Sequence, residues 1–99
     1  MAEEKKAPQI KLAFPEHLKA GVYSNLMVVN HTREEFILDF AMISPPHGSV
    51  SARVIMSPGH MKRTIIALQE NVKRYEKKFG KITEAKEPGG KGPLGFIKS

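Results

Sequence analysis

The stretch SPGHMKRTIIALQENVKRYEKKFG, residues 57–80, predicts one long amphipathic helix. Ser57 is a good N-cap, since its hydroxyl can accept a hydrogen bond from a free amide of the first turn, and Pro58 suits the first helical position. Gly80 supplies the left-handed residue that commonly follows a helix. The apolar residues of the stretch recur at spacings of three and four, the period of one helix face, and are Met61, Ile65, Leu68, Val72, Tyr75 and Phe79.

The residues before this helix predict an antiparallel sheet. Residues 9–14 alternate apolar and polar side chains and stop at Pro15, which is typical of a short strand. Three further strands are predicted at 22–31, 35–43 and 49–56, separated by short connections at 31–34 and 44–48. The fold class that follows is α+β, an antiparallel sheet of three to four strands and then one long helix, in the order β-β-β-β-α.

The predicted strands carry more apolar surface than one helix can cover. If the alternation of side chains continues along each strand, one set lies on the uncovered face: Met27, Val29, Ile37, Ala41, Ile43 and Ile55. An apolar face of that size is rarely left in water. We therefore expect a homodimer in which this patch meets itself across a twofold axis. The alternative is a strongly curved sheet that closes upon itself.

The length and the ends of the chain indicate one small domain. We expect residues 1–8 to be disordered, residues 9–82 to form the domain, and residues 83–99 to form a flexible basic tail rich in Gly and Pro. The tail carries Leu94, Phe96 and Ile97 near its end, which are either a docking strip for another protein or an ordinary chain end.

The net charge of +6 is concentrated in the helix and the tail. Residues 59–80 hold six Lys or Arg against two Glu, whereas residues 21–58 hold two against three acids. Glu70 is spaced to pair with Lys73 and Arg74. On a helical wheel the side opposite the apolar stripe carries Lys62, Arg63, Ile66, Glu70, Lys73, Arg74 and Lys77. The candidate anion-binding residues are Lys62, Arg63, Lys73, Arg74, Lys77 and Lys78. They form either an anion-binding face, with nucleic acid as its expected partner, or a face that only keeps the helix soluble.

The sequence shows no constellation of residues that predicts catalysis. It has no cysteine, its four histidines are separated along the chain, and Gly-x-Ser-x-Gly is absent, so we expect no enzyme, no metal site and no cofactor. Asp39 lies within an apolar strand, and a cross-strand pair with Arg53 would compensate both charges. No apolar stretch is long enough for a membrane span and the first residues lack a secretion signal, so a cytoplasmic protein without membrane contact is expected.

Residues 21–82 resemble a small bacterial and archaeal family described as domain of unknown function 3467. Four blocks carry the resemblance, GVYSN (21–25), EFILDF (35–40), RVIMSP (53–58) and LQENVKRYE (68–76). The family implies no activity that could be transferred. A weaker likeness, in layout alone, is to single-stranded DNA binders of the transcriptional coactivator and whirly type, which also run antiparallel strands into Ser-Pro and a long helix and which dimerise.

Two functional hypotheses follow. The first is a non-catalytic, dimeric binding module that contacts nucleic acid through the basic helix face and the tail. The second is a protein-interaction or structural subunit that docks a partner through its apolar sheet face or its C-terminal tail.

Overall fold

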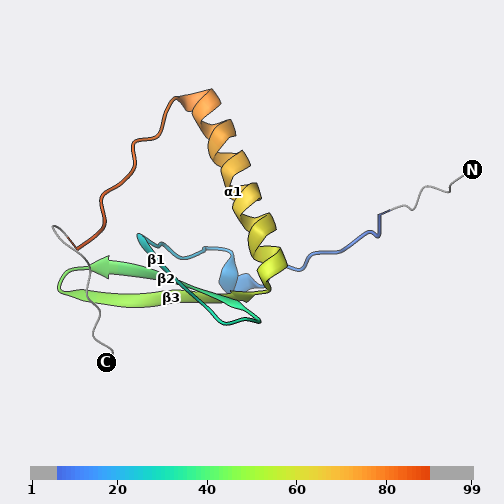
Figure 1. Cartoon of the computed structure of the whole chain (residues 1–99), viewed down its shortest axis with the longest axis horizontal. Coiled ribbons are helices and arrows are strands. Elements are labelled where there is room, and N and C mark those ends of the chain that lie inside the picture. The colour runs from blue at the N-terminus through green and yellow to red at the C-terminus, as the bar shows by residue number, and fades with distance from the viewer. Residues whose placement is uncertain (1–6, 90–99) are drawn as a thin grey trace, which may run out of the picture.

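The chain folds as a three-stranded antiparallel sheet followed by one long helix, in a computed structural model that describes residues 7–89 (Figure 1). The elements, in chain order, are a short 3-10 helix η1 (Glu16–Leu18), the strands β1 (Leu26–His31), β2 (Phe36–Ser44) and β3 (His47–Met56), and the helix α1 (Pro58–Phe79). The predicted α+β class is therefore confirmed, with three strands among the described residues.

The sheet has the order β1-β2-β3, so each strand pairs with its neighbour in sequence. The connection between β1 and β2 is closed by Thr32, whose backbone amide donates to the Glu35 carbonyl at 2.9 Å and whose hydroxyl accepts from the amides of Glu34 and Glu35. Pro45 and Pro46 alone separate β2 from β3. His47 and Gly48, which the sequence placed in a loop, therefore belong to β3, because a turn of two residues lets pairing resume at once.

The predicted strand at residues 9–14 does not form. The segment extends away from the sheet, and Ile10 and Leu12 are highly exposed (Figure 1). Alternation predicts which side chains share a face, but a strand also needs a neighbour that accepts its backbone hydrogen bonds. Within the described residues no strand lies beside this segment, so residues 9–14 form no strand despite their alternation.

β1 begins at Leu26, four residues later than predicted, because side chains take over the pairing before it. The Asn25 carboxamide accepts from the Ile43 amide at 2.8 Å and donates to the Ile43 carbonyl at 2.9 Å. Ser24 donates from its hydroxyl to the Ala41 carbonyl at 3.1 Å. These contacts hold residues 24–25 beside β2 in place of a regular ladder.

The helix begins and ends where the sequence predicts. The Ser57 hydroxyl accepts from the His60 amide at 3.2 Å, and Pro58 is the first helical residue. At the other end Gly80 has a φ of 99°, and its amide donates to the Glu76 carbonyl at 2.9 Å. This backbone conformation is one that side chains with a Cβ rarely adopt, which explains why α1 ends at glycine.

A β-bulge decides which β3 side chains share a face. Phe40 pairs with Ala52 and Ala41 pairs with Val50, so Ser51 is left out of the ladder. Val54 and Met56 consequently lie on one face and Val50 on the other. The sequence placed Val50, Val54 and Met56 together, and this prediction is wrong because simple alternation does not allow for an extra residue.

The register defines two faces of the sheet, since directly paired residues project to the same side. The helix-side face is the one from which Met56 meets α1, where Thr64 donates from its hydroxyl to the Met56 sulfur at 3.6 Å. We define the helix-side face by Met27, Val29, Phe36, Leu38, Phe40, Met42, Val54 and Met56. We define the outer face by Leu26, Val28, Ile37, Asp39, Ala41, Ile43, Val50, Arg53 and Ile55.

This division corrects the predicted dimer patch. Met27 pairs with Phe40 and Val29 pairs with Leu38, so both lie on the helix-side face. The other four residues of that patch, Ile37, Ala41, Ile43 and Ile55, lie on the outer face. The prediction was wrong because the offset between β1 and β2 cannot be read from alternation within each strand alone.

The core of the single chain is small because α1 leans away from the sheet (Figure 1). Leu38 at 5% exposure and Ala41 at 6% are the buried hydrophobic residues of the described chain. Along α1 the contact is limited to the first turns, and Leu68 and Phe79 are 62% and 67% exposed. The expectation that strands cover the apolar stripe is therefore not met within one chain.

Candidate nucleic-acid interface

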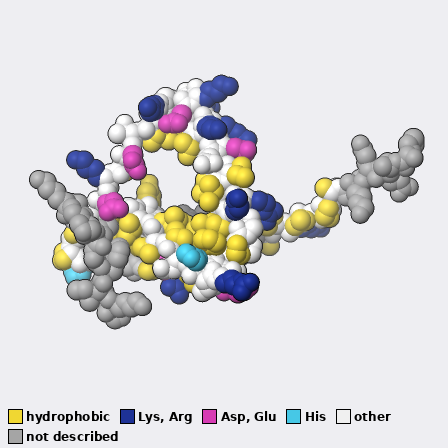
Figure 2. Space-filling view, viewed as in Figure 1, with side chains coloured by type: hydrophobic (Ala, Val, Ile, Leu, Met, Phe, Trp, Pro, Cys, Tyr) yellow, Lys and Arg dark blue, Asp and Glu magenta, His cyan; other side chains and the backbone are white. Residues whose placement is uncertain are grey.

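The candidate interface is the basic face of α1, the side of the helix opposite its apolar stripe. Figure 2 shows hydrophobic side chains along the edge of the helix that faces the sheet, and most Lys and Arg side chains along its outer edge and far end. The six predicted residues are all exposed: Lys62, Arg63, Lys73, Arg74, Lys77 and Lys78. Helical periodicity brings them together, because positions three and four apart lie on the same side.

No cation of the basic face forms an ion pair within the described residues. Within residues 7–89 the ion pairs are Lys19 with Glu16 at 2.8 Å and Arg53 with Asp39, neither of which involves α1. Glu70 therefore does not form the predicted pairs with Lys73 and Arg74, because its carboxylate stays beyond ion-pair distance of either. The cations remain available for a partner outside the chain.

Two of the six cations have a local contact that orients the side chain. The Arg63 guanidinium lies 3.2 Å from His60 Nδ1, one turn earlier on the helix. Lys78 Nζ lies 5.4 Å from the centre of the Phe79 ring, a cation–π distance. Neither contact neutralises a charge. Both leave the positive group at the surface.

The dimensions of the face suit a nucleic-acid backbone. From residue 62 to residue 78 the helix rises about 24 Å. One strand of B-form DNA places a phosphate about every 3.4 Å along its axis, so the face spans about seven phosphates. The exposed rings of Tyr75 and Phe79 lie on the opposite stripe, 5.0 Å apart. Only the Phe79 ring lies near one of the six cations, Lys78, and it is already in contact with that ammonium group, which favours backbone contact over base stacking.

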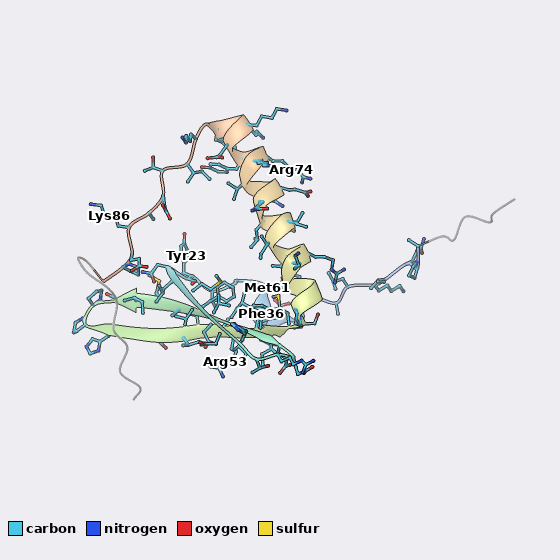
Figure 3. The ribbon with its side chains drawn as sticks, in the orientation of Figure 1. Tyr23, Phe36, Arg53, Met61, Arg74 and Lys86 are labelled. Atoms are coloured by element: carbon cyan, nitrogen blue, oxygen red, sulfur yellow. The ribbon has the colours of Figure 1, made fainter. Side chains whose placement is uncertain are left out.

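The outer face of the sheet carries the predicted pair of Asp39 and Arg53. Arg53 Nε and Nη2 donate to the two oxygens of Asp39 at 2.6 Å and 2.9 Å. These bonds hold the pKa of the Asp39 carboxyl below its ordinary value and raise the pKa of the guanidinium. Figure 3 shows Arg53 on the side of the sheet away from α1. Both oxygens of the Asp39 carboxylate accept from Arg53, so the pair links β2 to β3 and its role is structural.

The sequence did not predict the roles of two side chains, Asn25 and Tyr23. The carboxamide of Asn25 bonds to the backbone amide and carbonyl of Ile43, as a residue of a neighbouring strand would. The signal that could have predicted this role is an amide side chain directly before an apolar run. The second is Tyr23, which is 87% exposed and points from the helix side of the sheet into the space beneath α1 (Figure 3). Nothing in the pattern of residues 21–25 indicates the direction of that side chain.

Two further predictions concern a metal site and a membrane span. No group of three or more His, Asp or Glu within residues 7–89 is placed to hold a metal ion. The same part of the chain contains no helix with both the length and the apolar character required to cross a bilayer. Leu94, Phe96 and Ile97, the predicted docking strip, lie outside the described residues, as do residues 1–6 of the predicted disordered start.

Comparison with known proteins identifies the family of the chain but indicates no function. Neither a curated protein nor a solved structure matches it. The likeness in layout to coactivator and whirly-type DNA binders thus stays a prediction. A family profile, described as Protein of unknown function (DUF3467), matches residues 1–84, which include all strands and the helix. The chain belongs to this family of proteins of unknown function.

Proposed function

We propose that the chain is a non-catalytic, homodimeric module that binds nucleic acid through the basic face of α1. The observation that carries the proposal is the set of six exposed Lys and Arg side chains on one helix side, none of them paired with a carboxylate of the described chain. A rigid helix holds these charges in a fixed row. Their contacts would be with phosphates, so binding would depend weakly on base sequence and strongly on salt.

The charge distribution supports the proposal beyond a role in solubility. Residues 21–58, which contain the sheet, have a net charge of −1, whereas residues 59–80 have a net charge of +4. A polyanion approaching the molecule is therefore attracted to one side of it. Solubility alone would be served by both signs mixed over the surface. The tail adds further Lys residues, and we include it in the proposed contact.

The proposal is tested by fluorescence anisotropy with labelled single-stranded and duplex oligonucleotides at rising salt. If all six cations contact phosphates, log K plotted against log salt has a slope of about −5 on duplex DNA. The triple variant Lys73→Gln, Arg74→Gln, Lys77→Gln should bind more weakly and reduce the slope to about −3. Undetectable binding by the wild-type chain at low salt would contradict the proposal.

A matched control separates the helix face from total charge. The triple variant Lys11→Gln, Lys19→Gln, Arg33→Gln removes the same number of charges at exposed positions outside α1. It should retain nearly the wild-type affinity and slope. Equal weakening by both triple variants would mean that net charge alone, and no particular face, attracts the nucleic acid.

The second candidate function is a subunit that docks another protein through an apolar surface or the C-terminal tail. The exposed stripe of α1 and the exposed residues of the helix-side face favour it. A stoichiometric protein complex isolated from the native host, unchanged by nuclease treatment, would support this candidate. The oligonucleotide titration would then show no binding.

A further inference from the structure

We infer that a second copy of this chain fills the open angle between α1 and the sheet, so that the stripe of each helix packs on the helix-side face of the other copy. The stripe is defined by Met61, Ile65, Leu68, Val72, Tyr75 and Phe79. This inference specifies the self-association within the proposed function. It does not require that the basic face bind nucleic acid, and the two are tested separately.

The two surfaces border the same space. Figure 2 shows hydrophobic side chains lining both the inner edge of the helix and the side of the sheet beneath it, with an opening between them. Met61 and Phe36 lie where the two surfaces meet, at the base of α1 (Figure 3). Farther from this base the stripe is exposed up to Phe79, and Met27, Met42 and Val54 are exposed on the sheet. The stripe of one copy could therefore cover the helix-side face of another copy, and each would supply the apolar contact that the other lacks.

The chain's own helix is prevented from closing this angle by its short connection. Only Ser57 separates the last residue of β3 from the first residue of α1, and its hydroxyl caps the helix. The Thr64 hydroxyl lies 2.8 Å from the His60 carbonyl oxygen, within the helix, and 3.6 Å from the Met56 sulfur, so the second turn of α1 lies against the end of β3. A rigid helix that starts at this angle moves away from its own sheet as it proceeds. Its far half therefore needs a different surface.

The chemistry of the two surfaces fits a second copy. The stripe and the helix-side face contain no Lys, Arg, Asp or Glu, so burying them leaves no unpaired charge. The helix of 22 residues and β3 of 10 residues are both about 33 Å long. A helix of one copy can thus lie along the whole sheet of the other. Each copy supplies one stripe and one face, so a twofold axis satisfies both at once.

The available area also fits a stable dimer, which buries about 800 Å² on each partner. Tyr23, Tyr75 and Phe79, each more than half exposed, together present on the order of 400 Å² of ring surface. The exposed aliphatic side chains of the stripe and of the helix-side face supply the remainder. The basic face points away from this contact, which keeps the charges of the two helices out of the interface.

The test is the mass of the full chain, measured by light scattering after gel filtration in high salt and after nuclease treatment. We expect twice the 11.0 kDa of one chain. Leu68→Glu, within the stripe, should give the mass of a single chain. Ile66→Glu places the same charge at an exposed position on the opposite side of the same helix and should remain a dimer.

A second pair of variants tests which face of the sheet is used. Val54 and Ile55 are neighbours on β3, both exposed, and lie on opposite faces. Val54→Glu should produce single chains, and Ile55→Glu should not. If Leu68→Glu loses its helical circular dichroism, Phe79→Ala serves instead, because truncating this exposed ring leaves the fold intact. It should raise the dimer dissociation constant on the order of tenfold.

The inference is overturned by a single-chain mass of the wild type at every concentration. It is equally overturned if Ile55→Glu dissociates the dimer and Val54→Glu does not, since the outer face would then be the interface. A single-chain mass combined with unfolding of Phe96→Glu would assign the stripe to the chain's own tail. If the wild-type chain is a dimer but binds no oligonucleotide at low salt, the proposed nucleic-acid role is contradicted and this inference stands.

Discussion

Asp39 and Arg53 face each other across β2 and β3, and the guanidinium donates to both carboxylate oxygens, at 2.6 Å and 2.9 Å. Asp39 is only 8% exposed, while Arg53 is exposed. The bidentate pair lets a carboxylate remain charged within a largely apolar strand. It also ties the middle strand to the strand from which α1 continues.

We predict that Asp39→Asn lowers the stability of the protein at neutral pH and has a diminishing effect in acid. The pKa of the Asp39 carboxyl is lower in the folded chain than in the unfolded one, chiefly because Arg53 donates to it. Such a group stabilises the fold above its unfolded pKa, and the contribution is lost as the pH falls from about 4 through the lowered value. Urea unfolding at several pH values measures the difference. A stability difference that stays constant down to pH 2.5 would contradict the role of the Asp39 carboxylate. The companion variant is Arg53→Lys, which keeps the positive charge but loses the two parallel hydrogen bonds of the guanidinium.

We predict that Ser57→Ala destabilises the fold by about 1 kcal/mol. The substitution removes the hydroxyl that accepts from the His60 amide at the start of α1. Ser57→Asp keeps an acceptor and adds a negative charge at the positive end of the helix, so its stability should equal or exceed that of the wild type. Thermal and urea unfolding at one fixed protein concentration would check both. Equal losses in the two variants would contradict the capping role of Ser57, because Asp retains the acceptor.

We predict opposite effects of alanine at two glycines of the helix region. Gly80→Ala should destabilise by about 1 kcal/mol, because the φ of 99° at Gly80 is unfavourable for a residue with a Cβ. Gly59→Ala should stabilise by about 0.5 kcal/mol, because Gly59 is helical and a Cβ there meets no atom within 4 Å. Urea unfolding of both variants measures the two signs. Stabilisation by Gly80→Ala would mean that the C-cap differs from the one described.

We predict that Leu38→Ala costs about 2 to 5 kcal/mol, since Leu38 is the most buried large side chain of the small core. Val50→Ala removes methyl groups from an exposed position of β3 and should change the stability by no more than about 0.5 kcal/mol. The free energies of unfolding must be compared at equal protein concentration, because self-association adds to apparent stability. A small loss in Leu38→Ala would place the core elsewhere.

Local signals account for the parts of this fold that could be predicted. Helix α1 is marked at both ends by residues with a specific backbone role, Ser57-Pro58 and Gly80, so its bounds are read correctly from sequence. The pairing of Asp39 with Arg53 could be predicted because both are isolated charges in neighbouring apolar strands. The basic face could be predicted because the helical period places its residues on one side whatever the surroundings.

Non-local relationships account for the parts that could not be predicted. Residues 9–14 alternate as a strand should, yet they have no partner strand. The offset between β1 and β2, and the residue inserted at Ser51, decide which side chains share a face, and neither is encoded in a single strand. The predicted dimer patch consequently mixed two faces of the sheet.

By itself the sequence determined the three strands that form, the ends of the helix, the position of the charges and the excess of apolar surface. These depend on residues close together in the chain, where backbone preferences and periodicity act directly. Only the tertiary structure decided which apolar surfaces remain open. The register of the strands depends on contacts between residues distant in the chain, and the angle between β3 and α1 depends on how Thr64 meets Met56 across the connection at Ser57. The helix-side face and the stripe of α1 are open for this reason.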